Sequence, residues 1–249
     1  MHRFYLPEAK SETSLTLTER EAHHAANVLR IRKGEIVTVL NGTGAEFLCE
    51  AQEVSKRNVT LAIREKKTVA PLPYQLTLLQ AVPKGKLMET IIQKATELGV
   101  SRIVPLLTER VITQVGDDRA EEKREKWQQV AIEAIKQCGQ PWLPKVEAPM
   151  TPADFLRRGN NFDLPLIASL QFGSQHPRAF FSNYREMNQR APKSVCIWVG
   201  PEGDFTPAEV EQIIASGVMP ITLGRLVLRC ETAAIYCLSV ISYELQSEE

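Results

Sequence analysis

The sequence lacks any apolar run of the length that a membrane-spanning helix needs, which is about 20 residues. Its first twelve residues, MHRFYLPEAKSE, also lack the apolar core of a signal peptide. Hydrophobic residues make up 43% of the chain and charged residues 24%, an ordinary composition for a globular protein. We therefore expect a cytoplasmic protein without a membrane segment.

Cysteine is scarce and scattered, at positions 49, 138, 196, 230 and 237. The number is odd and no two cysteines form a Cys-x-x-Cys pair, which argues against a disulfide framework and against a zinc site. The four histidines show no metal-binding spacing either. We expect buried thiols in a reducing compartment, and no metal.

The common nucleotide-binding and hydrolase fingerprints are missing as well. The chain contains no GxGxxG after its first strand, no GxxxxGK[ST], no GxSxG and no HExxH. The formal net charge is +0, so the protein has no global basic field. If it binds RNA, it must do so through a local basic patch.

The first seventy residues read as β-rich. Residues 35–54 hold two β-branched runs around Asn41-Gly42, a strong hairpin signal, and residues 58–67 predict a further strand. A short helix is expected from a Thr18 cap, with Glu21 at the spacing of a capping box. Two prolines in residues 69–75 interrupt the pattern, which places a domain boundary near residue 72 and predicts domains over residues 1–72 and 73–249.

Beyond the boundary the pattern changes to α/β. Residues 75–82 form a continuous apolar run, typical of a strand buried on both faces, and residues 84–100 show helical spacing that ends at Gly99. Another strand follows, which predicts a βαβ unit with parallel pairing. A long helix over 117–139, three further short strands and a closing helix over 230–246 give about five or six mostly parallel strands.

Residues 197–211, IWVGPEGDFTPAEVE, place a tight turn with two carboxylates between a buried strand and a helix. Thr206 and Glu209 predict a capping box, with Pro207 at the first helical position. Glycines at 200 and 203 let the backbone approach a ligand closely. The turn is either a ligand site at a strand end or an ordinary βα loop, and the residues alone leave both open.

A second strand-end loop, residues 223–234, carries the apolar triplet Leu226-Val227-Leu228 between Arg225 and Arg229. Glu231 lies near the positive end of the following helix, a favourable place for a carboxylate. Arg229 and Glu231 are either functional or a surface pair worth at most about 1 kcal/mol.

Taken together, KLMETIIQKATELGV, EAIKQCGQ, WVGPEGDFTPAEVE and LGRLVLRCETAA, behind a β domain that contains HHAANVLRIRKGE, resemble a known family. The family is that of the bacterial 16S ribosomal RNA (uracil-N3)-methyltransferases, which belong to the SPOUT superfamily. The resemblance covers essentially the whole chain. It implies a PUA-like β-barrel domain followed by an α/β SPOUT methyltransferase domain with a C-terminal trefoil knot, a topology that sequence physics would exclude as too rare.

The resemblance also implies that S-adenosylmethionine binds in the knot, held by three loops. The positions that carry over are Leu170 and Gln171 in the first loop, Val199, Gly200, Glu202 and Gly203 in the second, and Leu223, Gly224, Leu228 and Thr232 in the third. The apolar triplet would then wall the adenine.

The implied reaction is methylation of N3 of a uridine in small-subunit ribosomal RNA. That nitrogen is protonated at neutral pH, so the site needs a base or a cation that stabilises the uracil anion. Arg229 is the candidate cation. Glu202 either acts as a base or only organises the turn, and we favour the second.

The implied partner is 16S ribosomal RNA, which we expect to be bound in the assembled small subunit. Candidate RNA-binding positions are Arg3, Arg30 and Arg32 in the first domain and Lys84, Lys86, Lys94 and Arg110 in the second. The alternative is that they form a solvated charged face. Related enzymes are homodimers, and the closing helix, around Ile235, Leu238, Ile241 and Leu245, supplies either a dimer surface or plain core.

Two positions depart from the family pattern. Asp204 stands where a second glycine is expected, and Gln140 stands where the family often has arginine. Two other functions stay open: a SPOUT enzyme that acts on tRNA or on a ribose 2′-hydroxyl, and a non-catalytic RNA-binding protein with this fold. The intact second and third loops speak against the non-catalytic protein.

Overall fold

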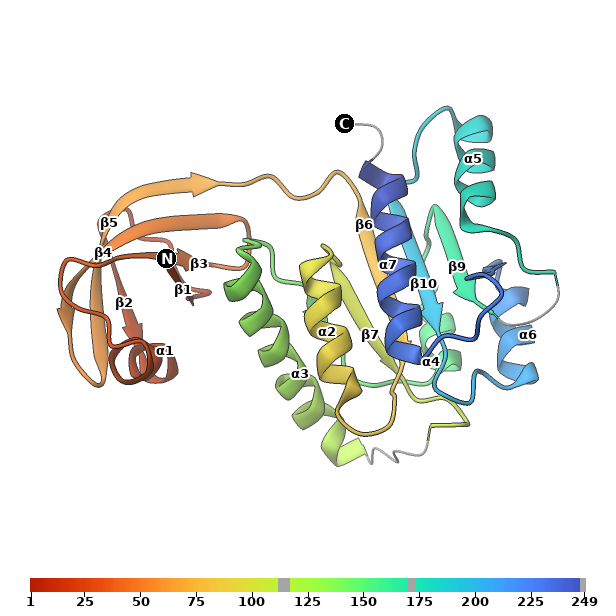
Figure 1. Ribbon diagram of the computed structural model, residues 1–249, viewed down its shortest axis with the longest axis horizontal. Helices are drawn as coiled ribbons and strands as arrows, with labels where there is room; N and C mark the ends of the chain where they lie inside the picture. The colour runs from red at the N-terminus through yellow and green to blue at the C-terminus, as the bar shows by residue number, and fades with distance from the viewer. Residues whose placement is uncertain (112–116, 170–172, 247–249) are drawn as a thin grey trace. The chain divides into compact units, whose positions relative to one another are not determined.

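The structure, a computed structural model, describes residues 1–111, 117–169 and 173–246 (Figure 1). The chain divides into two compact units. One is Met1–Pro71 with Ile132–Leu143, and the other is Leu72–Ala131 with Pro144–Glu249. No helix in the described part of the chain combines the length and apolar character that a membrane crossing needs.

The first unit is built on a five-stranded sheet with the order β1-β3-β4-β5-β2. Strands β3, β4, β5 and β2 pair antiparallel, whereas β1 pairs parallel with β3. Alternation along β2 buries its leucines and exposes its serine and threonines, as a half-buried strand requires. The bounds are β1 (His2–Tyr5), β2 (Ser14–Thr18), β3 (Ile36–Leu40), β4 (Ala45–Val54) and β5 (Asn58–Thr68).

The predicted hairpin at Asn41-Gly42 is confirmed, because β3 and β4 pair antiparallel across it. The Asn41 side-chain oxygen accepts hydrogen bonds from the backbone N–H groups of Thr43 and Ala45, each at 2.9 Å. Gly42 has a φ of 75°, a conformation that favours glycine. The asparagine therefore stabilises the turn by side-chain hydrogen bonds, and the glycine stabilises it by adopting a positive φ.

The expected capping box at Thr18 is wrong. Helix α1 (Glu19–His23) begins there and continues as the π-helix η1 (His24–Val28), but the Thr18 side chain makes no capping hydrogen bond. Glu21 instead accepts a hydrogen bond from Lys136 Nζ at 2.9 Å. Lys136 is buried and needs a counter-charge, so this ion pair takes the carboxylate that a capping box would use.

The C-terminal part of helix α3 (Asp117–Cys138) and the chain that follows it belong to the first unit. Arg3 donates from Nη1 to the carbonyl oxygens of Lys136 at 3.3 Å and Gln137 at 3.0 Å, and so caps the end of this helix. Trp142 donates from Nε1 to the carbonyl of Val69 at 2.9 Å. Nothing in the sequence pattern indicated this packing, and the division at residue 72 stays a proposal.

The second unit holds a six-stranded sheet with the order β11-β9-β10-β6-β7-β8, in which every neighbouring pair is parallel. All the strand carboxyl ends therefore point to one edge. The bounds are β6 (Gln75–Ala81), β7 (Arg102–Leu106), β8 (Lys145–Val146), β9 (Leu164–Ala168), β10 (Ser194–Val199) and β11 (Met219–Ile221). The central strands β6 and β10 are almost wholly buried, which explains their continuous apolar sequences.

Helices cover both faces of this sheet. Figure 1 shows α2 (Leu87–Glu97) beside α7 (Cys230–Gln246), and α7 also packs on β10 and β6. The face with Leu79, Val104 and Trp198 packs against α4 (Pro152–Arg157) and α6 (Pro207–Ala215), where the Trp198 ring meets Phe155 edge-on at 5.3 Å. Helix α5 (Pro177–Asn188) packs on α7 and β9.

Helix α7 answers one alternative left open by the sequence for three of the four residues named there. Leu238 and Ile241 are fully buried and Leu245 is 5% exposed, so these three belong to the core of this chain, whereas Ile235 is only half-buried. Thr232, Tyr236, Ser239 and Tyr243 recur at helical spacing and lie exposed along the same helix.

Candidate functional site

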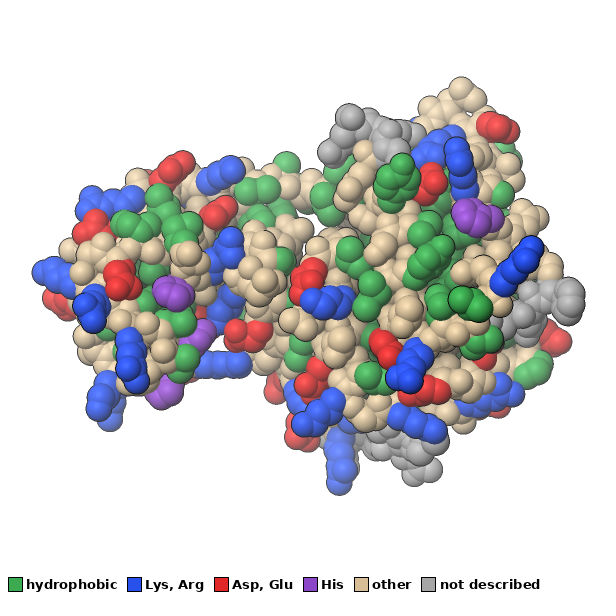
Figure 2. Space-filling model, in the orientation of Figure 1, with side chains coloured by type: hydrophobic (Ala, Val, Ile, Leu, Met, Phe, Trp, Pro, Cys, Tyr) green, Lys and Arg blue, Asp and Glu red, His purple; other side chains and the backbone are tan. Residues whose placement is uncertain are grey.

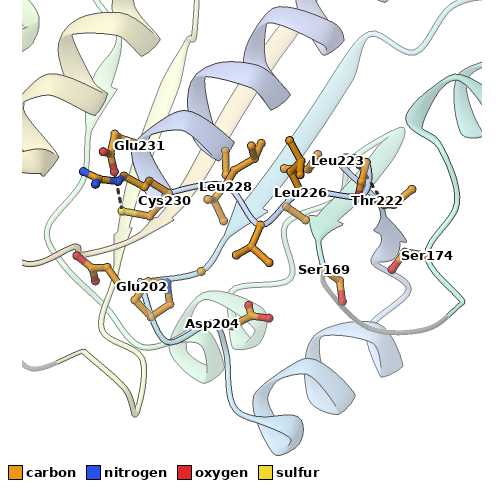
Figure 3. Close-up of a pocket in the computed structure, with 18 of the residues that line it drawn as sticks. Ser169, Ser174, Glu202, Asp204, Thr222, Leu223, Leu226, Leu228, Cys230 and Glu231 are labelled. Atoms are coloured by element: carbon orange, nitrogen blue, oxygen red, sulfur yellow. Dashed lines mark hydrogen bonds between the residues drawn. The ribbon is translucent and has the colours of Figure 1, made fainter.

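A cavity of about 890 Å³ opens at the carboxyl ends of β9, β10 and β11, the edge of a parallel sheet where ligands bind (Figure 3). We call it the strand-end cavity. Figure 3 shows Leu223, Leu226 and Leu228 along one wall and Glu202 and Asp204 along the opposite wall. Residues from the segments after all three strands line it, together with Leu87 from α2.

The turn after β10 is rigidly built. Asp204 donates its backbone N–H to the Pro201 carbonyl at 2.9 Å. The predicted capping box at the start of α6 is confirmed: Thr206 accepts from the Glu209 N–H at 3.3 Å, and Glu209 accepts from the Thr206 N–H at 2.9 Å. A Cβ at Gly200 would lie 2.8 Å from Asp204 Oδ1, so only glycine fits there without a shift.

Glu202 joins this turn to a neighbouring loop. Its Oε1 accepts a hydrogen bond from the backbone N–H of Lys84 at 2.9 Å, in the loop between β6 and α2. The sequence analysis favoured Glu202 as an organiser of the turn over a base; that role stays a prediction, and this hydrogen bond supports it.

Asp204 explains one departure from the family pattern. Its φ is 60°, a left-handed conformation that glycine adopts freely and that aspartate tolerates better than most residues. Its Oδ1 accepts from the Phe205 N–H at 2.8 Å. Burial raises the pKa of this carboxyl, while the Phe205 hydrogen bond and the charge of Arg110 act in the opposite direction.

The third loop supplies the apolar wall. Leu226 is 76% exposed and Val227 is 78% exposed, unusual values for large apolar side chains within one loop. Thr222 fixes the start of the loop, because its Oγ1 accepts from the Gly224 N–H at 3.2 Å. An apolar surface that only a ligand or a partner chain would cover is thus presented beside the strand-end cavity.

Two charged residues follow this loop into α7. Arg229 lines the strand-end cavity with its side chain exposed, and among the described residues no hydrogen bond or ion pair holds its guanidinium. Glu231 also lines the cavity and accepts a hydrogen bond from Cys230 Sγ at 3.4 Å. Arg229 and Glu231 therefore do not form the surface pair that the sequence left open.

Cys230 is the one thiol in the lining. Burial, followed by the hydrogen bond to Glu231 and by nearby carboxylates, raises the pKa of Cys230 to about 12. A thiol with such a pKa stays protonated at neutral pH and is a poor nucleophile. The cavity therefore favours a reaction without a cysteine adduct.

Most of the expected cofactor-binding positions meet in this cavity. Val199, Gly200, Glu202, Leu223, Gly224 and Leu228 line it, as does the candidate catalytic residue Arg229. Gly203 and Thr232 are described but fall outside the lining, and Leu170 and Gln171 lie outside the described residues. The sequence analysis missed several lining residues, namely Leu87, Ser169, Ser174 and Thr222. The strand ends before Ser169 and Thr222 were the signal that pointed to them.

The candidate RNA-binding residues are placed in different settings. Arg30 and Arg32 are exposed in the first unit, and Lys84 and Lys86 are exposed in the second. The others are engaged within the protein: Arg3 caps α3, Lys94 pairs with Glu97 at 2.8 Å, and Arg110 donates to the carbonyls of Gly203 and Phe205. Within the described ranges, no group of three or more His, Cys, Asp or Glu residues is placed to hold a metal ion.

Comparison with known proteins agrees with this architecture. Residues 70–242 match the family model for an RNA methyltransferase domain, and residues 17–64 match the model for an RNA methyltransferase PUA domain. The expected fold, a PUA-like β domain followed by a parallel α/β methyltransferase domain, is thereby confirmed.

Relatives match along the whole chain. The ribosomal RNA small subunit methyltransferase E of Bacillus subtilis is 33% identical over 99% of this chain and 98% of its own. A solved methyltransferase structure from Legionella pneumophila with bound S-adenosylmethionine is 33% identical, covers 97% of this chain and 96% of its own, and has a TM-score of 0.87. The methyltransferase E of Neisseria gonorrhoeae, also bound to S-adenosylmethionine, is 28% identical over 98% and 97%, with a TM-score of 0.84. This chain belongs to the family of ribosomal RNA small subunit methyltransferases E.

Proposed function

We propose that this protein transfers the methyl group of S-adenosylmethionine to N3 of a uridine in 16S ribosomal RNA. The observation that carries the proposal is the strand-end cavity, which three loops build from backbone, glycine and an apolar wall. Its volume of about 890 Å³ lies in the range of small-molecule sites. Two relatives with matching folds are bound to this cofactor.

The residues present fit the cofactor. Gly200 keeps the turn after β10 free of a side chain that would collide with Asp204. Leu226, Val227 and Leu228 offer the apolar surface that an adenine ring needs, and Glu202 and Asp204 place carboxylates opposite it, which suits a positively charged sulfonium (Figure 3). Bound there, S-adenosylmethionine supplies an electrophilic methyl group.

The protein's own contribution is orientation and charge. The uracil N3 must lose its proton before it can act as a nucleophile, which leaves negative charge on the ring. Arg225 and Arg229 both line the cavity, and no described residue holds either guanidinium. We take Arg229, the last residue before α7, as the cation that stabilises that charge. Glu202 holds the turn through Lys84, and the target base must leave its stack to enter the site.

The proposal includes the partners that the resemblance implies. We propose that the substrate is the RNA of the assembled small subunit in the cytoplasm, with Arg30 and Arg32 as phosphate contacts. We also propose a homodimer, because Leu226, Val227, Tyr236 and Tyr243 leave large apolar or aromatic side chains exposed on the third loop and α7. The knot that the resemblance implies belongs to the same proposal. Sedimentation analysis of the wild type and of Tyr236→Arg tests the dimer, which the variant should weaken.

Calorimetric titration with S-adenosylmethionine tests the cofactor site directly. Saturable binding near one site per chain supports the proposal, and half-site binding indicates an asymmetric dimer. A folded protein that binds 16S RNA but no cofactor, even with small subunits present, would instead be a non-catalytic RNA-binding protein.

A further inference from the structure

A second cavity, of about 540 Å³, lies within the second unit between the start of α2 and the N-terminal half of α3. No part of the reaction described above uses it. Its lining residues come from the loop after β6 and from these two helices, and they are Val82, Pro83, Gly85, Lys86, Met88, Glu89, Arg119, Glu122, Lys123, Lys126 and Trp127. We call it the basic groove.

Positive charge predominates in the basic groove. Its cations are Lys86, Arg119, Lys123 and Lys126, against the two carboxylates Glu89 and Glu122. Lys126 Nζ lies 2.6 Å from Glu89 Oε1, so one cation is paired. The surplus stands out in a chain whose formal net charge is +0. Figure 2 shows Lys and Arg side chains, with Asp and Glu side chains among them, over the N-terminal ends of α2 and α3.

The charges are crowded around an aromatic ring. Lys123 Nζ lies 5.9 Å from the ring centroid of Trp127, which is itself 6% exposed. The pKa of Lys123 is lowered, first by burial and then by the charges of Arg119 and Lys126. Cations that repel one another in a partly desolvated groove form a surface that an anion would stabilise.

The basic groove adjoins the strand-end cavity. Leu87 lines the strand-end cavity, while its neighbours Lys86 and Met88 line the basic groove. The loop that carries Lys86 is tied to the turn after β10 by the hydrogen bond from Lys84 to Glu202. A nucleic acid whose base reached the first cavity would therefore bring its flanking backbone to the second.

We propose that the basic groove binds backbone phosphates of the RNA segment next to the target uridine, with Arg119, Lys123 and Lys126 joining Lys86 as contacts. The inference rests on the proposed function for its choice of RNA as the polyanion. It extends the RNA-binding surface onto α3, where the sequence pattern indicated only a charged helix. Phosphate contacts fix register and affinity without reading sequence.

The test compares two double variants that lose the same charge. Lys123→Gln with Lys126→Gln removes two cations from the groove. Lys145→Gln with Arg157→Gln removes two exposed cations that line neither cavity. Binding of small subunits, and of 16S RNA alone, is measured over a series of salt concentrations, alongside S-adenosylmethionine binding and thermal unfolding.

The groove variant is expected to bind RNA at least about fivefold more weakly than the control, with kcat at saturating RNA and cofactor affinity unchanged. The logarithm of the RNA association constant falls linearly with the logarithm of salt concentration. Each lost phosphate contact should make this slope less steep by about 0.7 for single-stranded RNA. Equal affinity and equal slope in the two variants would overturn the proposal. Binding of inorganic phosphate by the wild type that the groove variant loses, while both variants bind RNA equally, would also overturn it, since the groove would then be a site for free phosphate.

The two hypotheses fail in different ways. If the wild type binds 16S RNA but transfers no methyl group, the proposed function is wrong. The salt series then still tests whether the groove binds RNA. If methyl transfer proceeds and the groove variant behaves like the control, only the groove is wrong.

Discussion

Glu202 Oε1 accepts the backbone N–H of Lys84 at 2.9 Å and so joins the turn after β10 to the loop after β6. The two loops come from strands that pair directly in the sheet, so the hydrogen bond closes one corner of the strand-end cavity. The carboxylate is therefore committed to the backbone of the protein, although it also faces the site where chemistry is proposed.

Replacing Glu202 separates the two roles. Glutamine keeps an oxygen that can accept from Lys84, so Glu202→Gln should retain methyl transfer within about threefold of the wild type. Glu202→Ala loses the hydrogen bond and should lower kcat/KM by about tenfold, the effect of about 1.5 kcal/mol. If Glu202→Gln were as inactive as Glu202→Ala, Glu202 would be the base.

Arg110 is expected to act on cofactor affinity more than on RNA affinity. Its guanidinium donates to the carbonyls of Gly203 and Phe205 and so holds the turn after β10. Arg110→Gln should weaken S-adenosylmethionine binding by about fivefold, the cost of one hydrogen bond of about 1 kcal/mol, and leave the salt dependence of RNA binding unchanged. A lower salt slope with normal cofactor affinity would restore Arg110 as an RNA contact.

Asp204 should tolerate glycine better than alanine. At a φ of 60°, Asp204→Gly meets no steric penalty, whereas Asp204→Ala puts a Cβ in a left-handed conformation at a cost of about 1–2 kcal/mol. Both variants lose the hydrogen bond from the Phe205 N–H to the Asp204 side chain, so that loss does not contribute to the difference between them. Urea unfolding of the two variants measures the difference, and equal stabilities would contradict this account of the position.

The same residue predicts a pH dependence. Burial raises the pKa of Asp204 in the folded protein above 3.8, so folding favours the protonated form. Stability is therefore lost as pH rises from the unfolded pKa through the folded one. Asp204→Asn should be more stable than the wild type at pH 7, and the difference should shrink towards pH 3.5. A difference that is the same at both pH values would show that ionisation plays no part.

Arg229→Ala should lower kcat by about 10²–10³, as removal of one group that stabilises a developing anion does. Because hydroxide can deprotonate the uracil when pH is raised, the deficit should narrow at high pH, and Arg229→Lys should recover part of the rate. Single-turnover rates from pH 6.5 to 9.5 measure this. If Arg229→Ala kept a rate within a few-fold of the wild type, Arg229 would have no catalytic role. If the variant lost cofactor binding instead, Arg229 would be a binding residue.

The turn chemistry of this protein was readable from sequence because it is local. Asn41-Gly42 and the Thr206–Glu209 capping box each act within a few residues, and both formed as predicted. Thr18 and Glu21 have the same local signature, yet Lys136, far away in the chain, takes the carboxylate. A long-range ion pair leaves no periodic trace in the sequence.

The site was predictable only in part for the same reason. The strand end at Val199 and the loop that begins near Leu223 pointed to the strand-end cavity. The partners of Glu202 and Arg110, however, depend on how β6, β7 and β10 are arranged in the sheet. The knot, which stays a proposal, and the identity of the substrate were inferred from resemblance, because neither hydrophobic period nor composition encodes the threading of a chain. At Asp204 the structure explains a feature of the sequence. Its backbone is left-handed, which is why the family pattern has glycine at this position.

The most direct test of the central claim is to identify the methylated nucleoside. Small subunits that lack the modification are incubated with the protein and isotopically labelled S-adenosylmethionine, and the 16S RNA is digested and analysed by mass spectrometry. The account predicts label in 3-methyluridine, and its loss with Arg229→Ala. Label in a ribose-methylated nucleoside, or in tRNA but not in the small subunit, would contradict it.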